Sequence, residues 1–265
     1  MYSRAIRTNN AVLSYDVQGQ GSHVLLMFHG AGQDRSVFRQ LPAGILASFR
    51  IYAFDLFFHG ESTWSTNDPI SKEAWKLLIE AFCSSEQVDT FSVLGYSIGA
   101  RFALATLEAF PQKVNTCYLV APDGLARSAW FDLATGSAIG RRIFKRLMSN
   151  PRGMHRMFGM ANRTRLMDPA TLRFLEHQLD NEQKRARIYQ TWINFRLLRF
   201  SQSSLARLVQ ASQINFVVFV ANRDRIIPIK HLRAFLKRLK SAHLEIIDAN
   251  HRRVLSEALA RIVAP

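Results

Sequence analysis

The amino-acid sequence predicts an α/β fold, with helices on both faces of a mostly parallel, doubly wound β-sheet and a helical segment inserted before the last strands. Apolar strand-like runs alternate with amphipathic helix-like runs over the first 122 residues, as they do where helices connect parallel strands. The strand signal disappears over residues 123–212 and returns at residues 214–220. We therefore expect a core domain of residues 1–122 and 213–265 and a helical cap of residues 123–212.

The N-terminal part contains three predicted strands. Residues 12–17 alternate apolar and polar side chains, as a half-exposed strand does. Residues 24–28 are apolar throughout, as expected of a parallel strand buried on both faces. The glycine-rich loop 29–32 follows, and Asp34 or Ser36 is a candidate N-cap for a helix that continues to Leu46. Residues 50–54 form the third strand, which leads into the polar segment 55–62.

An apolar strand then ends in Gly95-Tyr96-Ser97-Ile98-Gly99, and a helical pattern follows at once. This G-x-S-x-G spacing between strand and helix is typical of a nucleophile elbow, a strained turn that raises a serine hydroxyl above the sheet. The two glycines remove Cβ atoms that would collide in such a turn. Ser97 is therefore the first catalytic candidate. The alternative interpretation is that the glycines only allow close packing and that Ser97 caps the helix.

Three further strands are expected at residues 114–121, 214–220 and 244–247, with helices at about 229–240 and 253–262. Asp224 follows the second of these strands, and His251 follows the third. Because the carboxyl ends of parallel strands emerge at one edge of a sheet, both side chains should meet Ser97 there. An imidazole activates serine by removing its proton, and a carboxylate orients that imidazole. Asp123, which also follows a core strand, is the alternative acid.

Composition restricts the other function classes. The two cysteines, Cys83 and Cys117, are far apart and are expected to be buried, inert thiols. No His/Cys cluster has the spacing of metal ligands, so we expect neither a metal nor another cofactor. The first ten residues lack a signal-peptide pattern, and no apolar run approaches the length of a membrane span. The expected location is the cytoplasm.

The charge is strongly positive, with a formal net charge of +15 at pH 7. Residues 123–212 alone contain sixteen Lys or Arg and six Asp or Glu. Such a surface attracts nucleic acid, anionic lipid headgroups or acidic substrates. No known nucleic-acid-binding module surrounds these residues. We therefore expect no nucleic-acid partner, and a surface that is solvated or makes weak contact with an anionic membrane.

Taken together, these motifs resemble those of the α/β-hydrolase superfamily, in particular its lidded serine hydrolases. The resemblance covers essentially the whole chain, and the order Ser, Asp, His matches that of the family. It consists of the loop 29–32, a block similar to D-x-x-G-H-G-x-S at 55–62, the elbow 95–99, Asp224 with Pro228, and the late His251. Two positions depart from the family pattern, since Phe58 and Asn250 stand where glycine is usual. They put the shape of the loops and pocket in doubt more than the chemistry.

The resemblance implies a role for each matching position. Ser97 would be the nucleophile, His251 the general base and then the acid, and Asp224 the residue that orients His251. The backbone N–H groups of Ile98 and Ala31 would form the oxyanion hole. His29, His59 and Asp55 are expected to support their loops rather than to react.

The expected activity is hydrolysis of a small or medium, hydrophobic ester-type small molecule through an acyl-enzyme. The candidate substrate-binding residues are Gly30, Tyr96, Trp130 and Phe131. Hydrolysis of C–C bonds, lactones or amides would use the same triad. Two non-enzymatic alternatives remain, namely a small-ligand receptor and a basic module that docks on membrane or nucleic acid.

Overall fold

The computed structural model describes residues 1–125, 129–163, 172, 176, 178–239 and 242–262, and the chain divides into two compact units. Unit 1 comprises Met1–Ala126 and Leu197–Pro265, and unit 2 comprises Arg127–Arg196. Unit 2 lies within the region 123–212 for which a cap was predicted. Helix α9 (Gln202–Ser212) falls in the same region but belongs to unit 1. A capping role for unit 2 stays a prediction.

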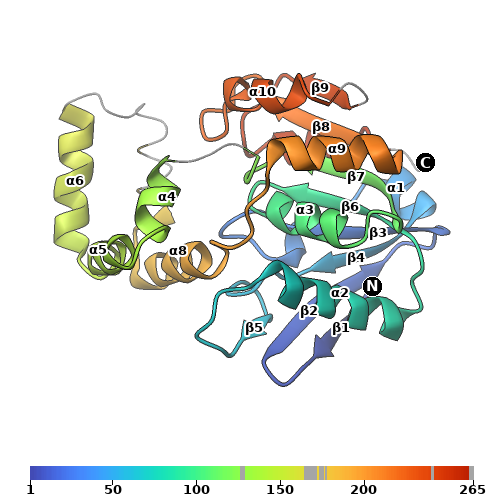
Figure 1. The fold of residues 1–265 in the computed structure, drawn as a ribbon, viewed down its shortest axis with the longest axis horizontal. Helices are drawn as coiled ribbons and strands as arrows, with labels where there is room; N and C mark the ends of the chain where they lie inside the picture. The colour runs from blue at the N-terminus through green and yellow to red at the C-terminus, as the bar shows by residue number, and fades with distance from the viewer. Residues whose placement is uncertain (126–128, 164–171, 173–175, 177, 240–241, 263–265) are drawn as a thin grey trace. The chain divides into compact units, whose positions relative to one another are not determined.

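One sheet forms the centre of unit 1 (Figure 1). Nine strands of the described chain join it in the order β1-β2-β4-β3-β6-β7-β8-β9, and β5 pairs with β2. The strands are β1 (Tyr2–Arg7), β2 (Ala11–Gln18), β3 (His23–Phe28), β4 (Phe49–Phe54), β5 (Thr63–Trp64), β6 (Phe91–Tyr96), β7 (Val114–Val120), β8 (Asn215–Ala221) and β9 (His243–Ile247). Neighbours from β4 to β9 are parallel, whereas β1, β2 and β5 pair antiparallel. The expected mostly parallel sheet is confirmed.

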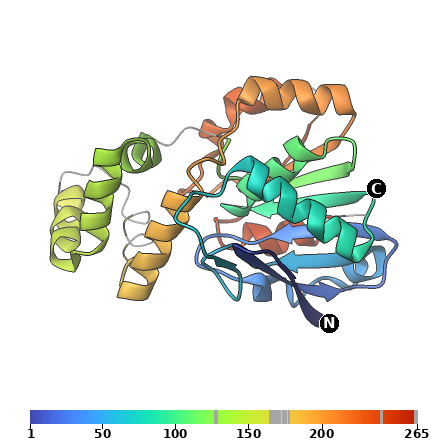
Figure 2. The same cartoon turned by 60° about the horizontal axis from the view of Figure 1, so that its bottom comes forward.

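Helices cover both faces of this sheet. Those of unit 1 are η1 (Arg35–Phe38), α1 (Ala43–Ser48), α2 (Lys72–Glu86), α3 (Gly99–Ala109), α9, η2 (Ile229–His231), α10 (Arg233–Leu236) and α11 (Val254–Leu259). Helices α2 and α3 lie side by side over one face (Figures 1 and 2), where Trp75 packs against Phe102 with ring centroids 4.8 Å apart. On the other face, Met27 of β3 shares a core with Ile45 of α1 and Val254 of α11. Strand β3 is therefore buried on both sides, as its apolar sequence predicted.

In unit 2, every element that the structure describes is a helix. These are α4 (Ala129–Thr135), α5 (Ala138–Met148), α6 (Pro151–Arg163) and α8 (Glu182–Asn194). Their apolar faces share a small core in which the ring of Phe144 stacks on Trp192 at 5.2 Å. Nowhere in the described residues is there a helix with both the length and the apolar character needed to cross a membrane.

Three local expectations were wrong. The helix expected from about residue 35 to Leu46 is split into η1 and α1 by Pro42, whose non-helical backbone forms the N-cap of α1. The helix expected at 229–240 is the pair η2 and α10, because Leu232 and Arg238 donate to carbonyls three residues back rather than four. Strand β2 is almost entirely buried rather than half exposed.

The buried carboxylate of Glu86 ties the end of α2 to the antiparallel edge of the sheet. Its oxygens accept hydrogen bonds from Tyr15 (2.8 Å), Tyr52 (3.1 Å) and Arg4 (2.8 Å). Burial acts to raise the pKa of Glu86, but the hydrogen bonds from Arg4 and the two tyrosines outweigh it and lower the pKa. The folded chain therefore favours the ionised form of Glu86.

We predict that Glu86→Gln makes the stability of the protein less sensitive to acid. The pKa of Glu86 is lower in the folded than in the unfolded chain, so wild type loses stability as the pH falls through and below 4.5, the ordinary Glu value. Glutamine does not titrate, so the free energy of unfolding should fall less steeply in the variant. Urea unfolding between about pH 6 and pH 3 measures both slopes. Glu80→Gln, at a half-exposed position of α2, is the control, and equal slopes for Glu86→Gln and wild type would contradict the prediction.

Candidate active site

Ser97 occupies a tight turn between β6 and α3. Its φ is +52°, in the left-handed region that residues other than glycine rarely adopt. Backbone hydrogen bonds hold it there: its N–H donates to Val120 (3.0 Å), and its carbonyl accepts from Asp123 (3.0 Å). A Cβ on Gly99 would lie 2.2 Å from the carbonyl oxygen of Phe28. The turn thus has the backbone of a nucleophile elbow. The alternative interpretation requires Ser97 to cap α3, but no side chain forms a cap hydrogen bond there.

Three predicted side chains form a continuous chain of contacts. His251 Nε2 lies 3.1 Å from Ser97 Oγ, and His251 Nδ1 lies 2.7 Å from Asp224 Oδ2. The other carboxylate oxygen, Asp224 Oδ1, accepts hydrogen bonds from the N–H groups of Ile226 (2.8 Å) and Ile227 (2.9 Å). When Nδ1–H donates to the carboxylate, Nε2 is left to accept the serine hydroxyl. This order of groups permits proton transfer from Ser97 to His251.

The parallel sheet brings these residues together from distant parts of the sequence. Strands β8 and β9 are paired up to Ala221 and Ile247, so the loops that carry Asp224 and His251 leave the same edge. Tyr96, at the end of β6, donates its hydroxyl hydrogen to the carbonyl of His251 at 2.7 Å. The side chain of Asp224 is almost completely buried, whereas Ser97 is only half-buried. The arrangement therefore combines a buried carboxylate with a partly exposed serine.

Asp123, the alternative acid, is occupied elsewhere. Its carboxylate pairs with the buried guanidinium of Arg101, with Nε at 2.7 Å from Oδ2. The same guanidinium donates to the carbonyl of Leu198. The geometry thus favours Asp224 as the partner of His251.

The two groups predicted to bind an oxyanion lie beside Ser97 in the topology. Ile98 immediately precedes the first residue of α3, where helix N–H groups lack partners within the helix. Ala31 lies in the loop after β3, which pairs in parallel with β6 up to Phe28 and Gly95. Both loops therefore start at adjacent positions on the sheet edge. The role of these two N–H groups stays a prediction.

Two histidines brace the loop that carries Ala31. His29 Nε2 accepts from the N–H of Leu56 (3.0 Å), and His59 Nε2 accepts from the N–H of Gly32 (3.1 Å). Their Nδ1 atoms face the carbonyls of Gly30 (2.8 Å) and Phe57 (3.0 Å). The expectation that these histidines bond to loop backbone is confirmed.

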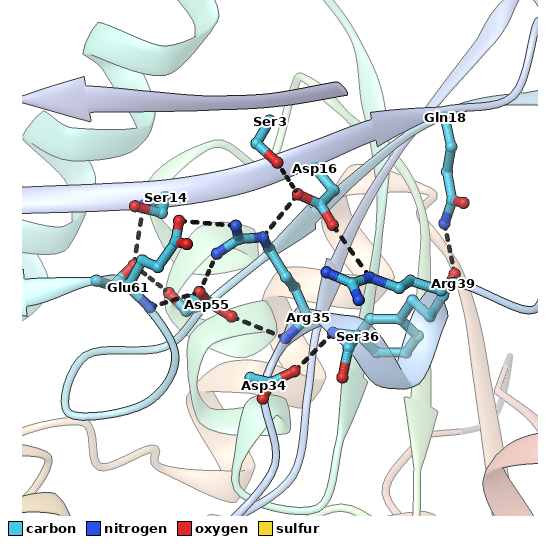
Figure 3. Close-up of polar contacts among 12 residues, drawn as sticks. Ser3, Ser14, Asp16, Gln18, Asp34, Arg35, Ser36, Arg39, Asp55 and Glu61 are labelled. Carbon is cyan, nitrogen blue, oxygen red and sulfur yellow. Dashed lines mark hydrogen bonds and ion pairs between the residues drawn. The ribbon is translucent and has the colours of Figure 1, made fainter. Parts of the chain in front are cut away.

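Arg35 is a structural residue that the sequence reasoning missed (Figure 3). Its buried guanidinium pairs with Asp16 of β2 (2.7 Å), with Asp55 after β4, and with Glu61 (2.8 Å). Asp55 also accepts hydrogen bonds from the N–H groups of Arg35 and Glu61, both at 2.8 Å, so it supports its turn as expected. The cluster fixes the start of η1, and with it the far end of the loop 29–34. The acid Asp16 within the predicted strand 12–17 was the signal available in the sequence.

The predicted substrate-binding residues fall into two groups. Tyr96 is buried, and its ring lies against that of His251 with centroids 5.5 Å apart, while a Cβ on Gly30 would touch the Tyr96 ring. Phe131 is buried in unit 2 against Trp192, and the side chain of Trp130 lies outside the described residues. Substrate contact stays a prediction for all four.

The two departures from the family pattern have local explanations. Phe58 takes a φ of +66°, so it adopts the left-handed conformation that glycine would provide without strain. Asn250 uses its side-chain oxygen to accept from the N–H groups of Arg252 (3.1 Å) and Arg253 (3.0 Å). This asparagine therefore shapes the turn that carries His251.

Both cysteines are buried free thiols, as expected. Burial raises the pKa of Cys83 to about 11 and raises the pKa of Cys117 further. Neither is therefore present as a reactive thiolate at neutral pH.

Comparison with known proteins identifies the family of the chain. The model of the alpha/beta hydrolase fold matches residues 23–257. An uncharacterized protein of Mycobacterium tuberculosis is 26% identical over 114 residues, which are 43% of this chain and 33% of that protein. The magnesium-chelatase 30 kDa subunit of Rhodobacter capsulatus is 33% identical over 86 residues, 31% of this chain and 28% of the subunit. The match thus spans about a third of the length of these relatives.

Solved structures resemble this chain over almost its whole length. A thermophilic esterase from Thermogutta terrifontis has a TM-score of 0.69 at 18% identity, covering 98% of this chain and 95% of the esterase. Naproxen esterase from Bacillus subtilis has a TM-score of 0.65 at 14% identity, covering 98% and 90%. At such identities, the likeness is one of fold.

We predict that Gly99→Ala destabilises the protein, whereas Gly44→Ala does not. The new Cβ at residue 99 would lie 2.2 Å from one backbone oxygen and 2.6 Å from another, so β3 or α3 must shift, at about 1 to 3 kcal/mol. A Cβ at Gly44 in α1 meets nothing within 4 Å, so stability should be unchanged or slightly higher. Urea unfolding measures both, and an equally stable Gly99→Ala would contradict the prediction.

Proposed function

The chain belongs to the alpha/beta hydrolase fold family, and from this premise we propose that it is a serine hydrolase that cleaves an ester-type substrate through an acyl-enzyme on Ser97. The observation that carries the proposal is the unbroken series of contacts from Ser97 Oγ through His251 to the buried Asp224. A hydroxyl, an imidazole and a carboxylate in this order are the groups that nucleophilic acyl transfer needs.

The mechanism follows from the positions of these groups. His251 Nε2 removes the proton of Ser97 as Oγ attacks the substrate carbonyl, and Asp224 stabilises the imidazolium that forms. His251 then gives the proton to the leaving alkoxide, which leaves an acyl group on Ser97. A water molecule, deprotonated by His251, attacks that acyl group, and His251 returns the proton to Ser97 Oγ as the carboxylic acid leaves. Bonds and protons balance over the cycle, and the products are an alcohol and a carboxylic acid.

Negative charge on the carbonyl oxygen develops in the first and last steps. We assign its stabilisation to the N–H groups of Ile98 and Ala31, which flank the elbow on neighbouring strand ends. One such donor typically contributes about 2.7 to 4 kcal/mol to lowering the barrier. The bracing of the loop 29–34 by His59 and Arg35 supports this role, because a donor must be held in place before the charge appears.

The substrate class is a small or medium hydrophobic ester. Esterases from Thermogutta terrifontis and Bacillus subtilis share the fold, which makes esters the first substrates to test. Lactones, amides and C–C bonds next to a carbonyl would pass through the same tetrahedral oxyanion. A panel of these substrates separates the classes by their kcat/KM values.

We predict that Ser97→Ala abolishes hydrolysis of p-nitrophenyl butyrate. Removal of the nucleophile should lower kcat on the order of 10⁶-fold, to background, and should prevent labelling by a fluorophosphonate probe. Ser256→Ala changes an exposed serine of α11 whose hydroxyl donates to the carbonyl of Arg253 at the start of the same helix, and it should keep activity and labelling. A wild type that neither cleaves the panel nor accepts the probe would refute the proposed function.

We also predict that Asp224→Asn lowers kcat far more than Asp123→Asn. An amide at 224 cannot hold the imidazole in the required tautomer, and the corresponding change in a serine protease costs about 10⁴-fold. Asp123→Asn weakens an ion pair with Arg101 and should leave kcat near that of wild type. Steady-state kinetics with p-nitrophenyl butyrate compare the two, after circular dichroism has shown that both are folded. The reverse order would assign the acid to Asp123.

A further inference from the structure

Helix α5 presents an unusual solvent-exposed stripe, formed by Ile139, Arg142, Ile143 and Arg146. These residues recur at i, i+3, i+4 and i+7, so they lie on one face of the helix. The two isoleucines are 73% and 64% exposed, and both arginines are exposed. The opposite face contributes Phe144 and Met148 to the core of unit 2. The α5 stripe is therefore not needed to hold unit 2 together.

The segment that contains α5 and α6 carries charge of a single sign, although the neighbouring helices α4 and α8 carry Asp132 and Glu182. Residues 133–167 include eight Lys or Arg and no Asp or Glu. Among the described residues, no carboxylate pairs with Arg142, Arg146 or the α6 residue Arg156. On the adjoining helix α6, exposed arginines recur at 152, 156 and 163, again on one face. These cations therefore keep their full charge available for an anionic partner.

We propose that the α5 stripe docks the protein on an anionic phospholipid surface. Guanidinium groups reach phosphate headgroups while the adjacent isoleucines insert between them, which is how amphipathic basic helices lie at a membrane interface. Each Lys or Arg near such a surface contributes about 1 kcal/mol of binding. The positive charge of the α5 stripe favours an acidic lipid as its partner, since a neutral headgroup would not attract the arginines.

The pairing of isoleucine with arginine favours lipid over nucleic acid. A nucleic-acid backbone neutralises basic residues but offers no hydrocarbon layer in which exposed isoleucine side chains lose contact with water. An acyl-chain boundary provides both. Exposed apolar residues are common singly on protein surfaces, whereas here two of them share one helix stripe with two arginines that pair with no carboxylate among the described residues.

Vesicle co-sedimentation of the full chain tests whether the arginines of the α5 stripe contribute to binding. Wild type should bind vesicles of phosphatidylcholine mixed with phosphatidylglycerol and should not bind phosphatidylcholine alone. The double variant Arg142→Gln/Arg146→Gln should bind about 30-fold more weakly, from about 1 kcal/mol for each lost cation. Arg142→Lys/Arg146→Lys keeps both charges and should retain binding.

A matched control separates the α5 stripe from net charge. Arg207→Gln/Lys237→Gln removes two exposed cations from α9 and the end of α10, so it lowers net charge equally and should retain wild-type binding. If both glutamine pairs weaken binding equally, the attraction belongs to the whole protein and the proposed stripe is wrong.

A second pair of variants tests whether the exposed isoleucines of the α5 stripe contribute to binding. Ile143→Ser should weaken binding about tenfold through lost insertion. Leu77→Ser, at a similarly exposed position of α2 (58% against 64%), should have no effect. Equal binding to neutral and anionic vesicles, or binding to duplex DNA or RNA without binding to vesicles, would overturn the proposal. None of these measurements depends on catalysis, because they can be repeated with Ser97→Ala.

Discussion

The approach of α3 to the end of β3 is the constraint on which the candidate site depends. The backbone of Gly99 packs so closely on the carbonyl of Phe28 that no side chain fits between them. The chain must therefore turn within a few residues of β6, and Ser97 takes a left-handed φ to do so. That conformation is unfavourable by roughly 1 to 2 kcal/mol, and backbone hydrogen bonds to Val120 and Asp123 hold it. Packing of the sheet thus stores the strain that lifts the serine hydroxyl clear of the core.

Buried charges at this sheet edge are paired, and each pair fixes a loop. Asp224 is held by two backbone N–H groups and by His251, so three protein groups fix the position of the carboxylate. Arg35 is held between carboxylates from β2 and from the segment after β4. Removal of one partner from such a pair would leave an uncompensated charge in the interior, which is costly. Hydrogen bonds from the protein therefore hold the loop that carries Ala31 at both ends.

The two units differ in their charge and in the residues that they contain. Unit 1 contains the sheet and the candidate triad, whereas unit 2 carries fourteen Lys or Arg and five Asp or Glu. Most of the net charge of +15 therefore resides in the helical insertion. A small core centred on Phe144 stabilises that insertion, which leaves the exposed side of α5 free to meet another surface. Ester chemistry and surface attachment would then be properties of separate units.

Local sequence determined the apolar strands, the glycine-serine turn and the order Ser97, Asp224, His251, because strand periodicity and turn chemistry depend only on neighbouring residues. The parallel alternation further determined that these side chains should share one sheet edge. Only the tertiary structure showed that Asp224 contacts His251 whereas Asp123 pairs with Arg101, since both are contacts between distant segments. It alone also revealed the cluster of Arg35, and the burial of a strand whose alternating pattern indicated exposure. A pattern of apolar and polar residues records which side chains avoid water, but the partner of a buried charge is set by the packing of the whole chain.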